Sequence, residues 1–257
     1  MTLRASNVTV ELGGTRALDA ASCHIAPGRI TAIIGPNGAG KSTLLRTFAG
    51  LLQPSSGAVS LDERPITDIG QRELAKAIAY LPQERIVHWP LSVHAIAALG
   101  RIPHRGGPSG DSPTDTAAIT AALEAANVSH LADRSFNTLS GGERARALFS
   151  RALAQQARIL LADEPVAGLD PAHAIELFVI LRKLAGEGRT VAVVIHELSM
   201  AARFCHDVVI VDAGRVVAAG DWATTATADR LGAAFGVRML MGTLDGQPIV
   251  VPASPEP

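Results

Sequence analysis

The chain has 257 residues and a formal net charge of −1, from 23 basic and 24 acidic side chains. This balance excludes a protein held mainly by the electrostatic field of DNA or of an anionic membrane. The two cysteines exclude a disulfide scaffold and a Cys-rich zinc module, and the 4% of aromatic residues argues against stacking platforms for single-stranded nucleic acid.

Apolar side chains suffice for a core, at 47% of the residues, but no uninterrupted hydrophobic run exceeds five residues. A membrane-spanning helix needs about 20. The first 14 residues also lack the apolar region of a signal peptide. We therefore expect a soluble intracellular protein with both cysteines reduced and buried.

The first third alternates short apolar runs with glycine-rich turns, a pattern that predicts strands. Gly13 and Gly14 separate the first two strands. The third is apolar apart from Thr31, as is typical of a strand buried on both faces. The predicted strands cover residues 7–12, 21–25, 30–34, 58–61 and 77–81. Helical spacing follows the third strand, over residues 42–49.

The middle of the chain is rich in alanine and leucine with helical periodicity. The predicted helices cover residues 92–99, 114–126 and 143–154. A Gly/Pro/Ser-rich loop over residues 101–113 separates the first two, and we interpret its Arg101 and Arg105 as solvated side chains rather than a phosphate site.

Strand–helix alternation returns in the last third. The predicted elements are strands at 159–162 and 190–195, a helix at 171–184, and a hairpin of strands 208–211 and 216–219 around Asp212-Ala213-Gly214. Two strand-like runs within 237–251 surround Asp245-Gly246, and we expect the last residues to be frayed. The whole pattern predicts an α/β core over 1–84 and 158–257, interrupted by a helical segment over 85–157.

A glycine-rich motif joins the strand at 30–34 to the helix that follows it. It fits the pattern G-x-x-x-x-G-K-[ST] and comprises Gly35, Pro36, Asn37, Gly38, Ala39, Gly40, Lys41 and Ser42. Such a loop aims successive backbone N–H groups at phosphate oxygens, helped by the positive end of the helix dipole. Lys41 would neutralise the β- and γ-phosphates, and the Ser42 hydroxyl would bind Mg²⁺. The alternative is a glycine-rich turn that happens to carry a lysine.

An apolar run over residues 159–162 ends in two carboxylates, Asp163 and Glu164. Beside a phosphate loop, such a strand would present Asp163 to magnesium and Glu164 to the γ-phosphate side. An acidic pair at the end of a strand is otherwise an ordinary structural feature.

Leu139-Ser140-Gly141-Gly142-Glu143 precedes the acidic strand. Taken alone it is a helix N-cap with a glycine-rich approach. In order with the two motifs above, it resembles the signature motif of ATP-binding cassette (ABC) ATPases. Gln83 resembles the glutamine loop of this family, Gly168-Leu169-Asp170 its D-loop and His196 its switch histidine. The resemblance covers residues 8–219 and implies a P-loop NTPase core, which is a RecA-like mixed sheet flanked by helices. It also implies an antiparallel β subdomain and an inserted α-helical subdomain. The helical subdomain covers residues 85–157 and contains the signature motif.

The resemblance also implies a role for each matching residue. ATP is bound by residues 35–42 and Thr43, with Mg²⁺ held by Ser42, Gln83 and Asp163. Glu164 is the general base, and His196 holds the γ-phosphate and orients the water. Ser140, Gly141 and Gly142 act on the nucleotide of a second copy in a head-to-tail dimer, which Asp170 contacts near the seam.

Two positions depart from the family pattern. Leu12 stands where an aromatic residue usually stacks on adenine, which keeps an apolar contact but loses the stacking. Glu143 replaces the commoner glutamine, and a carboxylate at the N-terminus of a helix suits the helix dipole. We therefore do not interpret Glu143 as inactivating.

The segment 83–104 and the tail 244–251 resemble the ATPases of iron-siderophore, haem and cobalamin importers. Trp89 is either an exposed anchor for a permease or ordinary packing under the glutamine loop. The histidines of the helical segment match no metal-ligand spacing, so we expect no metal site there; they are His88, His94, His104 and His130.

The resemblance thus implies the ATPase subunit of an importer for an iron chelate or a cobalamin-like compound. Its partners are a second copy, transmembrane permease subunits and, indirectly, a substrate-binding protein, at the cytoplasmic face of the membrane, with no nucleic acid. One alternative is another cargo, such as zinc, manganese or another small solute. A second is a soluble ATP-dependent switch without a permease. A P-loop kinase or GTPase is disfavoured because the signature is present and a guanine-reading N-K-x-D stretch is not.

Overall fold

The N-terminal strands form an antiparallel sheet in the order β2-β1-β4-β5. The computed structural model describes residues 1–84, 87, 89–106 and 112–255. In it β1 spans Leu3–Leu12, β2 Thr15–Ile25, β4 Ser56–Leu61 and β5 Arg64–Pro65. The predicted hairpin of the first two strands, with Gly13 and Gly14 at its turn, is confirmed. Both of its strands are longer than predicted, because the alternation of buried and exposed residues continues to Leu3 and begins again near Thr15.

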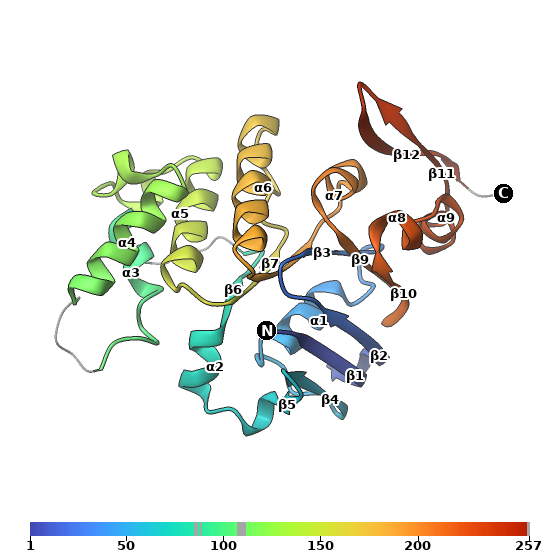
Figure 1. The fold of residues 1–257 in the computed structure, drawn as a ribbon, viewed down its shortest axis with the longest axis horizontal. Helices are drawn as coiled ribbons and strands as arrows, with labels where there is room; N and C mark the ends of the chain where they lie inside the picture. Colours follow the sequence, from blue (N-terminus) through green and yellow to red (C-terminus); the bar gives the residue numbers. More distant parts are fainter. Residues whose placement is uncertain (85–86, 88, 107–111, 256–257) are drawn as a thin grey trace. The chain divides into compact units, whose positions relative to one another are not determined.

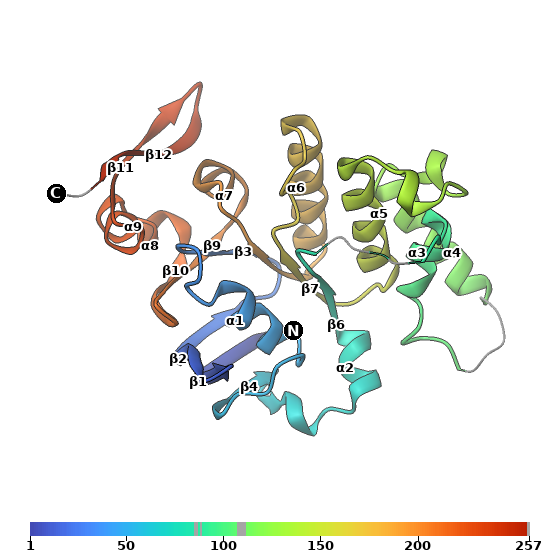
Figure 2. The same cartoon turned by 180° about the vertical axis from the view of Figure 1, so that it is seen from behind.

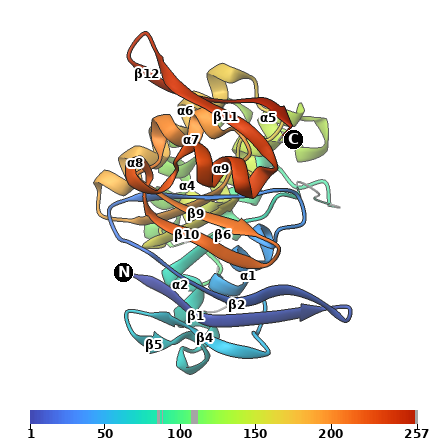
Figure 3. The same ribbon diagram turned by 90° about the vertical axis from the view of Figure 1, so that its right-hand side faces the viewer.

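A parallel group of strands surrounds β3 (Ile30–Ile34), with β8 (Thr190–Val194) on one side and β9 (Asp207–Asp212) on the other. Strand β10 (Arg215–Asp221) extends the group as an antiparallel partner of β9. All residues of β3 and β8 are buried, as predicted for apolar strands covered on both faces. Helix α1 (Lys41–Phe48) contacts β8 as well as β1 and β2. Figure 3 shows α1 beside β1 and β2.

The C-terminal part consists of short helices and a hairpin, coloured orange to red in Figure 1. The helices are α7 (Leu198–Phe204), α8 (Trp222–Thr225) and α9 (Ala228–Phe235). The hairpin is formed by β11 (Val237–Leu244) and β12 (Gln247–Pro255). The expectation of a frayed tail is wrong for the residues up to Pro255. Strand β12 is paired with β11 along its whole length, and its last residue, Pro255, lies opposite Val237.

The remaining elements lie between residues 66 and 186 and can be followed in Figure 2. Strands β6 (Ile78–Leu81) and β7 (Ile159–Asp163) pair in parallel. The helices are α2 (Gln71–Ala77), α3 (Val93–Leu99), α4 (Pro113–Ala125), α5 (Gly141–Ala154) and α6 (Pro171–Gly186). Short 3₁₀ helices cover Ile66–Asp68, Ser129–Leu131 and Phe136–Thr138.

The chain divides into two compact units. Unit 1 comprises residues 1–68 and 182–257, and unit 2 comprises residues 69–181. The predicted α/β class is confirmed, since strands and helices alternate in both units. The division predicted from sequence, 1–84 and 158–257 against 85–157, follows other boundaries than these units and stays a prediction.

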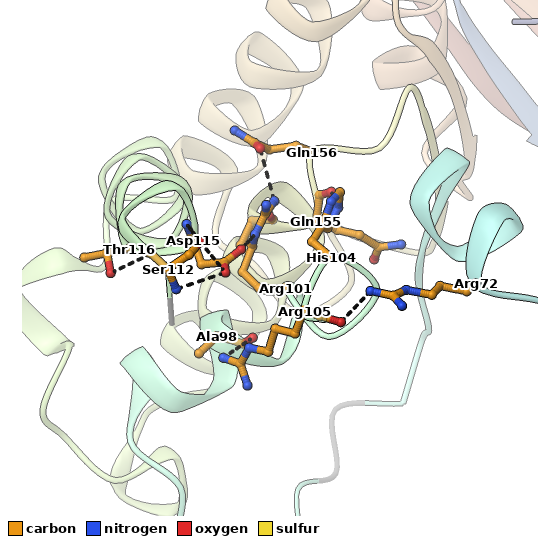
Figure 4. Close-up of polar contacts among 11 residues, drawn as sticks. Arg72, Ala98, Arg101, His104, Arg105, Ser112, Asp115, Thr116, Gln155 and Gln156 are labelled. Carbon is orange, nitrogen blue, oxygen red and sulfur yellow. Dashed lines mark hydrogen bonds and ion pairs between the residues drawn. The ribbon is translucent and has the colours of Figure 1, made fainter. Parts of the chain in front are cut away.

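The interpretation of Arg101 as a solvated side chain is wrong. Its guanidinium is buried and donates hydrogen bonds to the Asp115 carboxylate at 2.7 Å, the Ala154 carbonyl at 2.8 Å and the Gln156 side chain at 3.1 Å. Figure 4 shows Arg101 between Asp115 and Gln156. A hydrogen bond from the Ser112 hydroxyl, together with Arg101, lowers the pKa of Asp115 to about 2. The network fastens the turn after α3 to the N-terminus of α4 and the end of α5.

Two further expectations from the sequence concern the cysteines and membrane-spanning helices. Cys23 and Cys205 are free and buried, as expected, and burial raises the pKa of each thiol to about 12. Within the described ranges, no helix combines the length and the apolar character that crossing a bilayer requires.

Candidate functional site

The loop between β3 and α1 needs glycine at two positions. At Gly35, with φ of +148°, a Cβ would lie 1.9 Å from the Val211 carbonyl oxygen. At Gly40, with φ of +101°, a Cβ would lie 2.5 Å from the Ala17 carbonyl oxygen. Close approach of the backbone and left-handed conformation both exclude larger residues here. The shape of the loop therefore requires glycine at these two positions.

Lys41 and the helix N-terminus give this loop its chemistry. The buried Lys41 ammonium donates to the Gly35 and Pro36 carbonyls at 2.9 and 2.8 Å, so the loop wraps around its own cation. The N-cap residue Gly40 provides no side chain to the first N–H groups of α1. No atom lies within 4 Å of a Cβ built at Gly38, so that side of the loop is open. Amides, a cation and open space fit a phosphate group.

A hairpin turn far along the chain holds this loop in place. The Gly214 N–H, in the β9–β10 turn, donates to the Ala39 carbonyl at 3.0 Å. The Gly214 carbonyl in turn accepts from the Asp19 N–H, in β2, at 2.9 Å. The sequence predicted the turn but not this contact, because the pairing of β3 with β9 brings the two segments together.

The acidic strand ends as predicted, with Asp163 fully buried as the last residue of β7 and Glu164 half-buried just after it. The Tyr80 hydroxyl, on the neighbouring strand β6, donates to the Asp163 carboxylate at 3.3 Å. Tyr80 was not predicted, although it is the single tyrosine of the chain and lies within a predicted strand. Glu164 has a φ of +48°, a left-handed conformation that is rare for glutamate.

The signature-like segment caps α5. The Ser140 hydroxyl accepts from the Glu143 N–H at 3.3 Å, and the Glu143 carboxylate accepts from the Ser140 N–H at 2.7 Å. This reciprocal pair is a capping box, and the bond from the Ser140 N–H lowers the pKa of Glu143. Gly141 is exposed, and a Cβ there would meet no atom within 4 Å. The helix N-terminus is therefore open beside Gly141, while Glu143 takes the cap role at a position where glutamine is commoner.

Asp170 lies just before α6, where its carboxylate accepts from the His173 N–H at 3.0 Å and also contacts the His173 ring. The bond from the His173 backbone, followed by the bond from its ring, lowers the pKa of Asp170. The side chain of this D-loop-like residue is thus fixed by its own helix.

The remaining predicted residues follow the ends of strands. Gln83 is exposed after β6, and His196 is exposed after β8. Ser42 and Thr43 are half-buried in the first turn of α1, and Leu12 is 42% exposed at the end of β1.

Unit 1 brings together the phosphate loop with Ser42 and Thr43, and it also contains His196. Unit 2 contains Gln83, the acidic strand, the signature-like segment and Asp170. The roles of all these residues stay predictions.

Trp89 is 72% exposed, so its interpretation as ordinary packing is wrong. Leu99 and Ile102, in the same segment, are also exposed, at 40% and 56%. Of the four histidines considered above, His88 lies outside the described residues, and the His104 ring contacts the Gln155 carbonyl at 2.9 Å. The described part of the chain contains no cluster of three potential metal-ligating side chains.

Comparison with known proteins gives one family and several near relatives. Residues 18–167 match the family described as ABC transporter. The chain is 41% identical to a cobalamin import ATP-binding protein of Halobacterium salinarum over 95% of its own length, and it spans 61% of that relative. It is 40% identical to a hemin import ATP-binding protein of Nocardia farcinica, covering 98% of this chain and 89% of the relative. It is also 38% identical to a ferric enterobactin transport ATP-binding protein of Escherichia coli, covering 97% and 93%.

Solved structures show the same fold. A putative metal-chelate type ABC transporter in an inward-facing conformation superimposes with a TM-score of 0.85 at 25% identity, covering 98% of this chain and 97% of that one. A dimeric structure of a bacterial ABC transporter cassette superimposes with a TM-score of 0.76 at 30% identity, covering 85% and 98%.

Proposed function

Since the chain belongs to the ABC transporter family, we propose that it is the ATP-hydrolysing subunit of an importer for an iron chelate, haem or a cobalamin-like compound. The observation that carries the ATPase role is the phosphate loop, with its obligatory glycines and its buried Lys41. The match to the ABC transporter family and the similarity to ATP-binding proteins of this group of importers both agree with the sequence motifs. The cargo class rests on relatives that are named for the import of cobalamin, hemin and ferric enterobactin.

ATP binds to unit 1 through the loop amides, Lys41 and the first turn of α1. The Lys41 ammonium turns from the loop carbonyls toward the β- and γ-phosphates. Thr43 adds a hydroxyl one residue beyond Ser42, and the exposed Leu12 offers an apolar surface to the base. Because leucine lacks a ring, we expect discrimination between adenine and guanine to be weak.

The hydrolytic step is the transfer of the γ-phosphoryl group to water, which yields ADP and phosphate. Glu164 accepts the proton of the attacking water, and His196 holds the γ-phosphate and orients that water. Ser42, Gln83 and Asp163 are oxygen donors suited to Mg²⁺, which supplies charge neutralisation on the phosphate oxygens when bound. Tyr80 supports this set by holding the Asp163 carboxylate.

Two copies are needed for a complete site. The N-terminus of α5 presents Ser140, Gly141 and Gly142 as a second anion-binding surface. We propose that this surface closes over the nucleotide bound to the partner copy, with Asp170 near the seam. The dimeric state of a solved ABC transporter cassette supports the pairing of two copies.

The importer role requires a membrane partner. We propose that the chain binds permease subunits at the cytoplasmic face of the membrane as a peripheral protein, and that a substrate-binding protein delivers the cargo to them. Trp89 is the anchor for the permease, because a large, solvent-exposed aromatic residue is typical of the centre of an interface.

Co-purification tests this function. A tagged Glu164→Gln form is isolated with ATP from detergent-solubilised membranes of cells that express it, and the proteins recovered with it are identified. A many-helix permease together with an iron-chelate or cobalamin-type binding protein is expected. A permease of the metal-ion type would change the cargo, and recovery of the chain alone would favour the soluble switch.

A second variant pair tests the anchor. Trp89→Ala is expected to lower recovery of the permease at least tenfold while leaving ATP binding unchanged. Val179→Ala, which removes a similarly exposed apolar side chain from α6, serves as the matched control and should recover the permease normally. Equal recovery by both variants would exclude Trp89 from the interface.

A further inference from the structure

The hydroxyl of Ser199 fastens the C-terminal hairpin to α7 by two hydrogen bonds. The Ser199 Oγ donates to the Val250 carbonyl at 3.0 Å and accepts from the Val250 N–H at 2.9 Å. Val250 is buried, so both of its backbone groups depend on a protein partner. Ser199 therefore pairs with β12 much as a residue of a neighbouring strand would.

Ser199 lies three residues after His196, in the first turn of α7. The N-cap of this helix, Glu197, makes no side-chain hydrogen bond to the first turn, and the helix has only seven residues. A helix of this length is marginal without tertiary contacts. The hairpin therefore supplies the support that the first turn of α7 does not receive from its own cap. Figure 1 shows α7 and the hairpin at this end of unit 1.

A cavity of about 440 Å³ lies between the two segments. Residues 196–199 form one wall, and Met239, Val250 and Pro252 of the hairpin contribute to the other. His196 and Ser199 belong to the same wall of this cavity, so the fastening of their segment to the hairpin bears on the position of both. Ser199, which lies in the cavity wall, provides that fastening.

We propose that Ser199 is a positioning residue for ATP hydrolysis, through which the C-terminal hairpin holds the segment that carries His196. The inference rests on the proposed role of His196 as the residue that orients the γ-phosphate and the water. Ser199 itself touches no reacting atom. Its loss leaves the phosphate loop intact and increases the range of positions that His196 samples, so it acts on turnover rather than on ATP binding.

Steady-state ATP hydrolysis by the purified 257-residue chain tests this. Ser199→Ala is expected to lower kcat about tenfold with KM for ATP within twofold of the parent. Ser199→Thr keeps the hydroxyl and should restore most of the rate. Gln247→Ala removes the 3.3 Å bond from Arg203 at the other end of the hairpin and should leave kcat unchanged. An unchanged kcat in Ser199→Ala, or an equal fall in Gln247→Ala, would overturn the proposal.

A double-mutant cycle separates positioning from general stability. In a His196→Ala background, Ser199→Ala should cause no further fall in kcat, because the residue it positions is already gone. A full additional fall would show that Ser199 acts only on the fold and would overturn the inference. If His196→Ala alone leaves kcat unchanged, the role of His196 fails as well, which is a distinct result. Should circular dichroism show that Ser199→Ala is unfolded, Ser199→Cys replaces it, since it retains the volume and bonds weakly.

Discussion

The backbone of Glu164 is the least expected feature of the site at the scale of single residues. Its left-handed φ of +48° is unfavourable for a glutamate, and the Ala167 N–H donates to its carbonyl at 3.2 Å in the turn that follows. Residues held in such conformations are concentrated at functional sites, where the surrounding structure imposes them. The turn after β7 therefore fixes the direction in which this carboxylate leaves the strand.

Glu164→Gln preserves the shape of the side chain and removes its ability to accept a proton. We expect kcat for ATP hydrolysis to fall roughly 10²-fold, as on the loss of a general base, with ATP affinity within twofold of the parent. Glu124→Gln, an equivalent change at an exposed position on α4, is the matched control and should leave both values unchanged. Near-normal hydrolysis by Glu164→Gln would remove this residue from the role of base.

Residues close together in the sequence were predictable, and contacts between distant segments were not. The residues of the phosphate loop are contiguous, and the capping residues Ser140 and Glu143 are close together in the sequence. A local sequence pattern therefore reveals each of these two features. The contact of Tyr80 with Asp163 joins residues 83 positions apart and depends on the register of two strands. The register in which two strands pair cannot be predicted from the spacing of residues along the chain.

At the scale of elements, His206 fastens the start of β3, the strand that leads into the phosphate loop. The ring Nδ1 of His206 accepts a hydrogen bond from the Ile30 backbone N–H at 2.9 Å. The backbone N–H of His206 donates to the Ile30 carbonyl at 2.8 Å. Burial, followed by repulsion from Arg29 and Arg182, lowers the pKa of His206 below the usual 6.5. Asp207 and Asp221 oppose this shift.

This arrangement predicts a pH dependence of stability. Because the folded state favours neutral His206, its contribution is complete above the unfolded pKa of about 6.5 and is lost as pH falls below that value. The urea midpoint of unfolding should therefore fall between pH 7.5 and 5.5 by more in the parent than in His206→Gln, whose side-chain oxygen can accept from Ile30 without titrating. His24→Gln, at an exposed position, should behave like the parent. An equal pH dependence in the parent and His206→Gln would contradict the assignment.

Elements with strong apolar patterns were predicted well, and short or polar ones were missed. Strand β3 was predicted with its observed bounds because its apolar run is closed by Arg29 and Gly35. Helix α2 has no buried residue and hence no hydrophobic periodicity. Helix α9 was missed although its signals are present, since the Thr227 hydroxyl caps its start and Gly236 follows its end in a left-handed conformation.

At the scale of the whole molecule, the two helix ends that we propose as anion-binding surfaces belong to different compact units. The phosphate loop and α1 are in unit 1, and the signature-like start of α5 is in unit 2. Neither end is complete as a nucleotide site in the proposed function, because the second is expected to act on the nucleotide of another copy. We therefore propose that ATP joins two copies of this chain and that hydrolysis separates them.

Sedimentation velocity on the Glu164→Gln form measures this association. Dimers are expected with ATP and Mg²⁺, and monomers with ADP. Adding Gly141→Asp should abolish the ATP dimer, because its carboxylate repels phosphate, while the fold is kept since that position is open and an acidic residue suits the first turn of a helix. Gly106→Asp, at another open glycine, should dimerise like the parent. Monomers of the Glu164→Gln form in ATP, or equal dimers with and without Gly141→Asp, would contradict the account.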